Sequence, residues 1–173
     1  MRELRTTEHL IITVATTGAF QGKEANPNLP ERPEEIAQAA YESWNEGADL
    51  KFVTHHCGSM VPYLEQRIIG AYDHAEMLRG AKYKNALRKP PIDYFKMFYY
   101  DTAIYGSTPG LMCAYAFCGA DHLLFATDFP YDSQFGERYT RQTIQSIERM
   151  DISELAKKKI FEDNARKLFR LPI

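Results

Sequence analysis

The sequence has few cysteines, almost no net charge and no long apolar run. Three cysteines among 173 residues are too few, and odd in number, for a disulfide framework, so a reduced, cytoplasmic protein is expected. A formal charge of −2 gives no basic field for nucleic acid or for an anionic membrane. No apolar run approaches the roughly 20 residues that cross a bilayer, and the first residues lack the apolar core of a secretory signal. Neither nucleic acid nor a membrane is therefore expected as a partner.

The chain is instead rich in apolar side chains. Hydrophobic residues make up 45% of the sequence and aromatic residues 13%, which is enough apolar surface for a globular core. The sequence contains no internal repeat and no low-complexity segment. A chain of this length suits one domain, or one domain with an appendage.

Apolar, β-branched runs alternate with segments of helical periodicity. Strands are predicted at residues 10–15, 51–56, 97–102 and 122–127, and helices at residues 33–47, 61–75, 92–96, 111–119, 134–150 and 152–170. Strands that alternate with helices favour a parallel sheet. The sequence therefore predicts an α/β fold, either a partial (half) TIM-type (β/α) barrel with about four parallel strands or a small open sheet.

Ionisable side chains follow three of the predicted strands. His55, His56 and Cys57 end the second strand, Asp101 the third and Asp128 the fourth. The reactive groups of parallel α/β folds lie at the carboxyl ends of strands. Because neighbouring strand residues point to opposite faces, only one of the two histidines can face a shared site. An imidazole there can bind a metal or carry a proton, or it can serve only as a hydrogen-bonded part of the rim.

Asp128 allows two interpretations. It ends an apolar stripe of the fourth strand, where a carboxylate can bind a divalent cation or act as a general base. It can also fix the following loop, because the Phe-Pro pair at residues 129–130 begins a turn directly after it. Asp101 has the same position in its strand, but the turn region that follows it favours a capping role.

The other ionisable and aromatic residues have simpler interpretations. Cys113 and Cys118 are expected in the core of an apolar helix. His74 is expected on a helix surface. Packing rather than substrate binding is expected of the tyrosines Tyr94, Tyr99, Tyr100 and Tyr105.

Residues 51–173 resemble the C-terminal part of amidohydrolase-related proteins, the group that includes aminocarboxymuconate-semialdehyde decarboxylase. The matching stretches are FVTHHCGSMVPYLEQRI, FYYDTA, ADHLLFATDFPYD and FEDNARKLFRL. The resemblance implies the last three βα units of a metal-dependent (β/α)₈ barrel. It places His56 at a histidine that acts in catalysis and Asp128 at an aspartate that binds the metal and takes part in the reaction. It also implies a divalent metal, with zinc expected, and a small-molecule carboxylate substrate.

Residues 9–49 resemble a different family. The stretches LIITVATTGAF and ANPNLPERPEEIAQAAYESWNEGA are similar to the first βα unit of β-keto acid cleavage enzymes, which are also zinc-dependent (β/α)₈ barrels. Both families imply an HxH metal motif on an early strand, and this sequence has none. The chain is therefore predicted to join two pieces, residues 1–50 and residues 51–173.

Three functions are compatible with these observations. The first is a metal-dependent hydrolase or non-oxidative decarboxylase acting on a small carboxylated substrate. The second is cleavage of a β-keto acid, and the third is a non-enzymatic partial barrel that self-associates. A zinc site needs at least three protein ligands. Asp128 and His56 are the nominated metal ligands, with His55 or Cys57 as the remaining candidates. Metal affinity is therefore expected to be poor in a lone chain unless a partner supplies ligands, and a truncated or chimeric chain can be inactive.

The sequence also predicts a homo-oligomer. The strands at residues 10–15 and 122–127 would lie at the edges of a four-stranded sheet, and both are apolar. The inner face of a half-barrel would expose Phe52 and Leu124 to water. Covering such a surface favours association, most simply as a twofold dimer.

Overall fold

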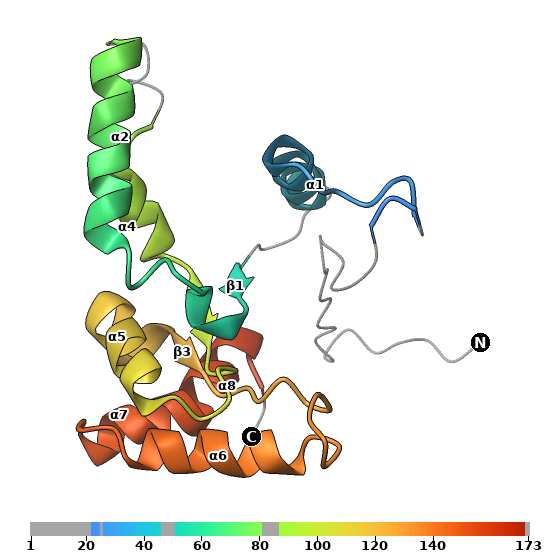
Figure 1. Cartoon of the computed structure of the whole chain (residues 1–173), viewed down its shortest axis with the longest axis vertical. Coiled ribbons are helices and arrows are strands. Elements are labelled where there is room, and N and C mark those ends of the chain that lie inside the picture. The colour runs from blue at the N-terminus through green and yellow to red at the C-terminus, as the bar shows by residue number, and fades with distance from the viewer. Residues whose placement is uncertain (1–21, 25, 46–50, 81–86, 172–173) are drawn as a thin grey trace. The chain divides into compact units, whose positions relative to one another are not determined.

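The computed structural model describes residues 22–24, 26–45, 51–80 and 87–171 (Figure 1). The chain divides into two compact units, residues 1–50 and residues 51–173. The strand predicted at residues 10–15 lies outside the described residues. No helix in the described part of the chain is long and apolar enough to cross a membrane.

The first unit contains helix α1, Pro33–Asn45, where a helix is predicted. Glu35 lies in its first turn and accepts a hydrogen bond from the Lys23 ammonium at 2.7 Å. This ammonium, together with two backbone N–H groups at the helix start, holds the pKa of Glu35 well below its usual range. None of the residues of α1 is buried, and both Tyr41 and Trp44 are exposed.

The second unit contains a three-stranded parallel sheet in the order β1-β2-β3. The strands are β1 Val53–Thr54, β2 Tyr99–Asp101 and β3 Leu123–Leu124. Each lies inside a predicted strand but is shorter than predicted. The α/β class is confirmed. The three predicted strands that fall on described residues form a parallel sheet, and the partial barrel stays a prediction.

Helices follow each strand of the second unit. After β1 come the 3₁₀ turn η1 and α2, with α4 packed against α2 (Figure 1). After β2 comes α5, and after β3 comes α6, which packs against α5. A continuous helical run then extends over residues 154–169. The bounds are η1 His56–Gly58, α2 Glu65–Arg79, α4 Pro91–Phe95, α5 Thr108–Cys118, η2 Ala120–His122, α6 Glu137–Glu148, α7 Glu154–Lys158, the π-helical η3 Lys159–Asp163 and α8 Asn164–Phe169.

The core lies between the sheet and the helices that follow it. Its fully buried apolar side chains come from β2, β3, α5, α6 and η3, and are Tyr100, Leu111, Leu123, Ile147 and Ile160. The Tyr100 hydroxyl donates to the Phe95 carbonyl at 2.7 Å, so this buried phenol is satisfied. A Cβ on Gly58 would clash with the Tyr100 ring, which requires glycine at the last residue of η1. The loop after β1 is therefore pressed against the core.

The two residues predicted to line an exposed inner face behave differently. Phe52 is 46% exposed, as predicted. Leu124 is only 6% exposed, because β3 packs against α5, α8 and η3. The prediction for Leu124 is therefore wrong, and the apolar surface of the sheet is smaller than the sequence indicated.

Candidate functional site

The candidate residues lie at one edge of the sheet. Because β1, β2 and β3 are parallel, their carboxyl ends meet at the same edge. His56, Asp101 and Asp128 belong to the three segments that leave this edge. The structure therefore brings the loops that carry them together.

Two of these residues lie beyond the strands instead of on them. His56 begins η1 with a φ of 51°, and Asp128 follows β3 by four residues with a φ of 61°. The alternation of faces expected along a strand therefore does not apply to them. Left-handed φ values are uncommon outside glycine and concentrate at functional sites. Cys57 and Tyr105 have them as well, with φ of 56° each.

Asp101 joins the loop after β1 to the loop after β2. Its Oδ1 accepts hydrogen bonds from the backbone N–H of Cys57 at 3.2 Å and of Ala103 at 3.0 Å. Its Oδ2 lies 3.2 Å from Nδ1 of His55, whose side chain is 82% exposed. The carboxylate is buried and accepts all three bonds, so its role is to fix the loops. This agrees with the capping role that the sequence favours for Asp101.

His56 is held through one ring nitrogen, and its other ring nitrogen has no hydrogen-bond partner among the residues that the structure describes. Its Nδ1 lies 2.9 Å from the backbone carbonyl of Ala103. A carbonyl can only accept, so Nδ1 carries the proton and donates it. In the neutral ring Nε2 then has the lone pair, which can take up a proton or bind a metal.

Asp128 is bound by a residue that the sequence analysis assigned to packing. The Tyr105 hydroxyl donates to Oδ2 of Asp128 at 2.6 Å. This hydrogen bond raises the pKa of Tyr105 to about 12, with smaller contributions from burial and from the negative charge of Asp128. The Tyr105 ring also lies 6.3 Å from the His56 ring, centroid to centroid. Tyr105 therefore lies next to both nominated site residues, and the Tyr-Gly pair in a strand-end loop was the available signal for it.

Thr102 is a second residue that the sequence analysis did not single out. It is 1% exposed. Its hydroxyl donates to the carbonyl of Ala126 and accepts from the N–H of Ala126, both at 2.9 Å. A side chain thus continues the pairing between the segments after β2 and β3. This contact fixes the backbone two residues before Asp128.

The described residues do not fit a complete metal site. No group of three or more histidine, cysteine, aspartate or glutamate side chains in the described part of the chain is placed to hold a metal ion. Cys57 is buried, and burial raises the pKa of its thiol to about 12, which disfavours the thiolate that binds metals. Asp128 and His56 can each offer one atom, so further ligands would have to come from elsewhere.

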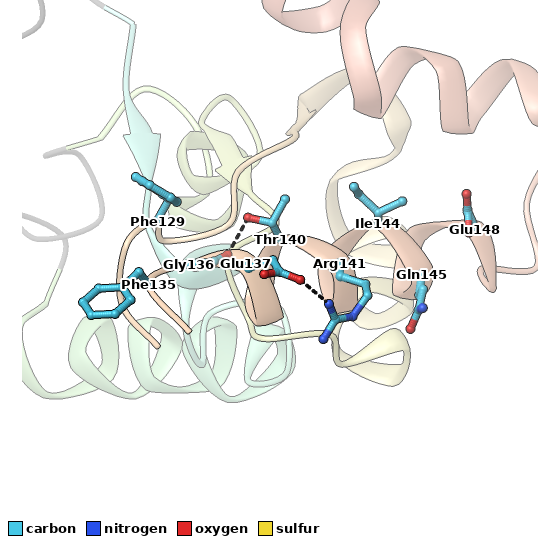
Figure 2. Close-up of a pocket in the computed structure, with 9 residues that line it drawn as sticks. All are labelled: Phe129, Phe135, Gly136, Glu137, Thr140, Arg141, Ile144, Gln145 and Glu148. Atoms are coloured by element: carbon cyan, nitrogen blue, oxygen red, sulfur yellow. Dashed lines mark hydrogen bonds and ion pairs between the residues drawn. The ribbon is translucent and has the colours of Figure 1, made fainter. Parts of the chain in front are cut away.

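An open groove of about 790 Å³ lies beside this edge, along α6. Figure 2 shows Phe129 and Phe135 at one end and the exposed side of α6 along its length. Glu137 and Arg141, which both line the groove, form an ion pair at 2.8 Å. Neither His56 nor Asp128 lines the groove, although Phe129 directly follows Asp128.

Two families match different parts of the chain. The family described as amidohydrolase matches residues 45–171. The family described as beta-keto acid cleavage enzyme matches residues 9–56. Both resemblances stated from the sequence are confirmed.

Two curated relatives match 70% of the chain. Gamma-resorcylate decarboxylase from Polaromonas sp. is 32% identical over 123 residues, which is 70% of this chain and 35% of the relative. The protein of the same name from Rhizobium radiobacter is 32% identical over 129 residues, with the same coverage. The chain spans about a third of the length of the curated relatives it matches.

Solved structures of decarboxylases share the fold. The 5-carboxyvanillate decarboxylase of Novosphingobium aromaticivorans, solved with manganese and a nitrobenzoic acid, has a TM-score of 0.59 at 23% identity over 74% of this chain and 35% of its own. The dihydroxybenzoic acid decarboxylase of Polaromonas sp., solved with manganese and 2-nitroresorcinol, has a TM-score of 0.58 at 29% identity over 81% of this chain and 41% of its own. Because the amidohydrolase match extends over residues 45–171, well over half of the sequence, this chain belongs to the amidohydrolase family.

Proposed function

We propose that residues 51–173 are the carboxyl-terminal part of a (β/α) barrel that performs non-oxidative decarboxylation of a small hydroxybenzoate. The observation that carries the proposal is the placement of His56, Tyr105 and Asp128 together at the carboxyl edge of the sheet. The 32% identity to gamma-resorcylate decarboxylase over 123 residues supports the reaction and the class of substrate.

Decarboxylation requires a proton at the ring carbon. The bond from this carbon to the carboxylate breaks, carbon dioxide leaves, and the electron pair remains on the carbon, which then takes up a proton. His56 is the proposed proton carrier, because its Nδ1 is bonded to the Ala103 carbonyl and its Nε2 is left for exchange with substrate. Protonated His56 delivers its Nε2 proton and regains one from water.

Asp128 is proposed as one ligand of a divalent metal. The family resemblance favours zinc, whereas the solved relatives named above hold manganese. The remaining ligands are not supplied by the described residues. They would come from parts of the barrel that the matched third of the relatives does not include, or from a second copy of the chain.

The test is decarboxylation of 2,6-dihydroxybenzoate by the full chain, followed as release of carbon dioxide with manganese, with zinc and with a chelator. We expect turnover only with a divalent metal. His56→Asn should lower turnover by about 10²-fold or more, the usual contribution of a general acid. His74→Asn is the control, because His74 is exposed on α2, and it should change nothing. The absence of carbon dioxide with either metal would contradict the proposal.

A second proposal, self-association, rests on the groove along α6. Phe129 and Phe135 are 69% and 85% exposed, and both line the groove together with Ile144 (Figure 2). Covering two phenylalanines removes on the order of 300 Å² of apolar surface from water, which favours association by several kcal/mol. A second copy is the proposed occupant. In an antiparallel pairing of two α6 helices about a twofold axis near Ile144, Arg141 faces the partner's Glu148, and the reverse pair forms as well.

Sedimentation of the full chain at micromolar concentration tests this pairing. We expect a dimer for the wild-type chain and a monomer for Phe135→Ser. Tyr63→Ser is the matched control, because Tyr63 is 79% exposed, close to the value for Phe135, but lies before α2. A monomeric wild-type chain would rule out the pairing.

The amino-terminal piece, residues 1–50, is proposed as a separate βα unit related to β-keto acid cleavage enzymes. The match of that family to residues 9–56 supports this assignment. An assay with a β-keto acid and acetyl-CoA separates the two chemistries. A new CoA thioester in this assay, without release of carbon dioxide in the first, would favour β-keto acid cleavage.

A further inference from the structure

Three side chains form a stacked column that ends on Asp128. The Arg138 guanidinium lies 4.7 Å from the centre of the Tyr139 ring. The Tyr139 ring stacks on the Tyr105 ring, with centroids 4.0 Å apart and planes inclined by 22°. The Tyr105 hydroxyl then donates to Oδ2 of Asp128. Cation–π and aromatic contacts each favour this arrangement, so the stacked side chains hold the Tyr105 ring in place.

The column is anchored in the loop that carries Asp128. The backbone N–H of Tyr139, in the first turn of α6, donates to Oδ2 of Asp132 at 2.9 Å. Asp132 lies four residues after Asp128 in the same loop. Both ends of the column are therefore fixed to one segment, residues 128–139.

The backbone conformation at Tyr105 directs its phenol. Tyr105 has a φ of 56° and Gly106 a φ of 87°. A Cβ on Gly106 would lie 2.8 Å from Cβ of Gln142, so this turn is pressed against α6. A bulky residue in the left-handed region is disfavoured and persists only when surrounding contacts impose it.

We infer that Tyr105 is a positioning residue that sets the orientation of the Asp128 carboxylate. Its hydroxyl donates to Oδ2 of Asp128. Oδ1 of Asp128 accepts no hydrogen bond from the described residues and is the oxygen left for metal or substrate. Tyr105 thereby fixes the rotation of the carboxylate and ties the loop after β2 to the loop after β3. This role rests on the proposed function for its chemical purpose, but the hydrogen bond itself can be tested without it.

The decisive variant is Tyr105→Phe, which keeps the stacked ring and removes only the hydroxyl. The control is Tyr139→Phe, which removes the hydroxyl of the neighbouring ring. Amide hydrogen exchange of residues 126–132 is measured by NMR on the full chain without metal. We expect exchange faster by about two- to tenfold in Tyr105→Phe, the range for loss of one net hydrogen bond, and unchanged exchange in Tyr139→Phe.

A manganese titration followed by electron paramagnetic resonance gives the functional readout. Loss of a group that orients a metal ligand typically weakens metal affinity by about 10- to 100-fold, so this loss is expected in Tyr105→Phe alone. If the wild-type chain binds no manganese, the metal assignment fails, while the exchange result still decides whether the Tyr105 hydroxyl holds the loop that carries Asp128. Unchanged exchange in Tyr105→Phe would overturn the inference. So would faster exchange with unchanged manganese affinity, which would leave Tyr105 only a structural role.

Discussion

Two junctions connect the loops at the carboxyl edge of the sheet, and they use aspartate differently. In the first junction, Asp101 is buried and accepts the backbone N–H groups of Cys57 and Ala103. In the second, Asp128 is only partly buried and accepts a side-chain hydroxyl from Tyr105. Asp101 is the last residue of β2, whereas Asp128 lies four residues beyond β3. The first junction therefore stabilises the edge, whereas the second keeps a carboxylate oxygen accessible for chemistry.

The largest effect on stability is expected from Asp101→Ala. The substitution leaves the N–H groups of Cys57 and Ala103 without an acceptor in a buried setting. It should lower the free energy of unfolding by about 2–5 kcal/mol, measured by urea denaturation. Asp101→Asn keeps a carbonyl oxygen for these groups and should recover most of the loss. If Asp101→Ala and Asp128→Ala lowered the free energy of unfolding equally, the two junctions would contribute equally to stability, against this comparison.

A smaller loss is expected from Thr102→Val, which changes the contact between the segments after β2 and β3. Valine has nearly the shape of threonine but removes the hydroxyl that both donates to and accepts from Ala126. The free energy of unfolding should fall by about 1–3 kcal/mol, because both backbone groups of Ala126 lose their partner. Thr108→Val is the control, since within the described part of the chain the Thr108 hydroxyl makes a single bond, to the carbonyl of Ser146. If Thr108→Val lowers the free energy of unfolding as much as Thr102→Val does, the second hydrogen bond of the Thr102 hydroxyl adds no stability.

The sequence predicted the helices and the strand order around this edge better than the contacts that its side chains make. Periodicity located the helices after each strand and the parallel order of the strands, because burial imposes both. The strands predicted at residues 51–56 and 122–127 are longer than those of the structure. No sequence pattern shows where a side chain such as Thr102 replaces backbone pairing. Tyr105 was missed because its partner, Asp128, is distant in sequence and the turn that joins them depends on tertiary packing.

The second junction should weaken at high pH. Tyr105 donates its bond only as the neutral phenol, and its pKa is raised to about 12 from an ordinary value near 10. A raised pKa for this acid means that its contribution to stability is complete below about pH 10 and is lost as pH rises towards 12. In Asp128→Asn the pKa of Tyr105 should fall, because the carboxylate acceptor is gone. Tyrosinate absorbance should then show earlier ionisation of one tyrosine in Asp128→Asn and no such change in Asp101→Asn.

The smallest effect on stability, and the largest on metal, is expected from Asp128→Ala. Among the described residues the carboxylate makes one side-chain bond, to the exposed Tyr105, so the free energy of unfolding should change by less than about 1 kcal/mol. Metal binding should nevertheless be abolished, because Asp128 is the proposed ligand of the second junction. His56→Asn should lower turnover more than it lowers manganese affinity, since His56 is proposed as the proton carrier. Stoichiometric manganese in Asp128→Ala would remove Asp128 from the site, and equal loss of metal in both variants would instead make His56 a ligand.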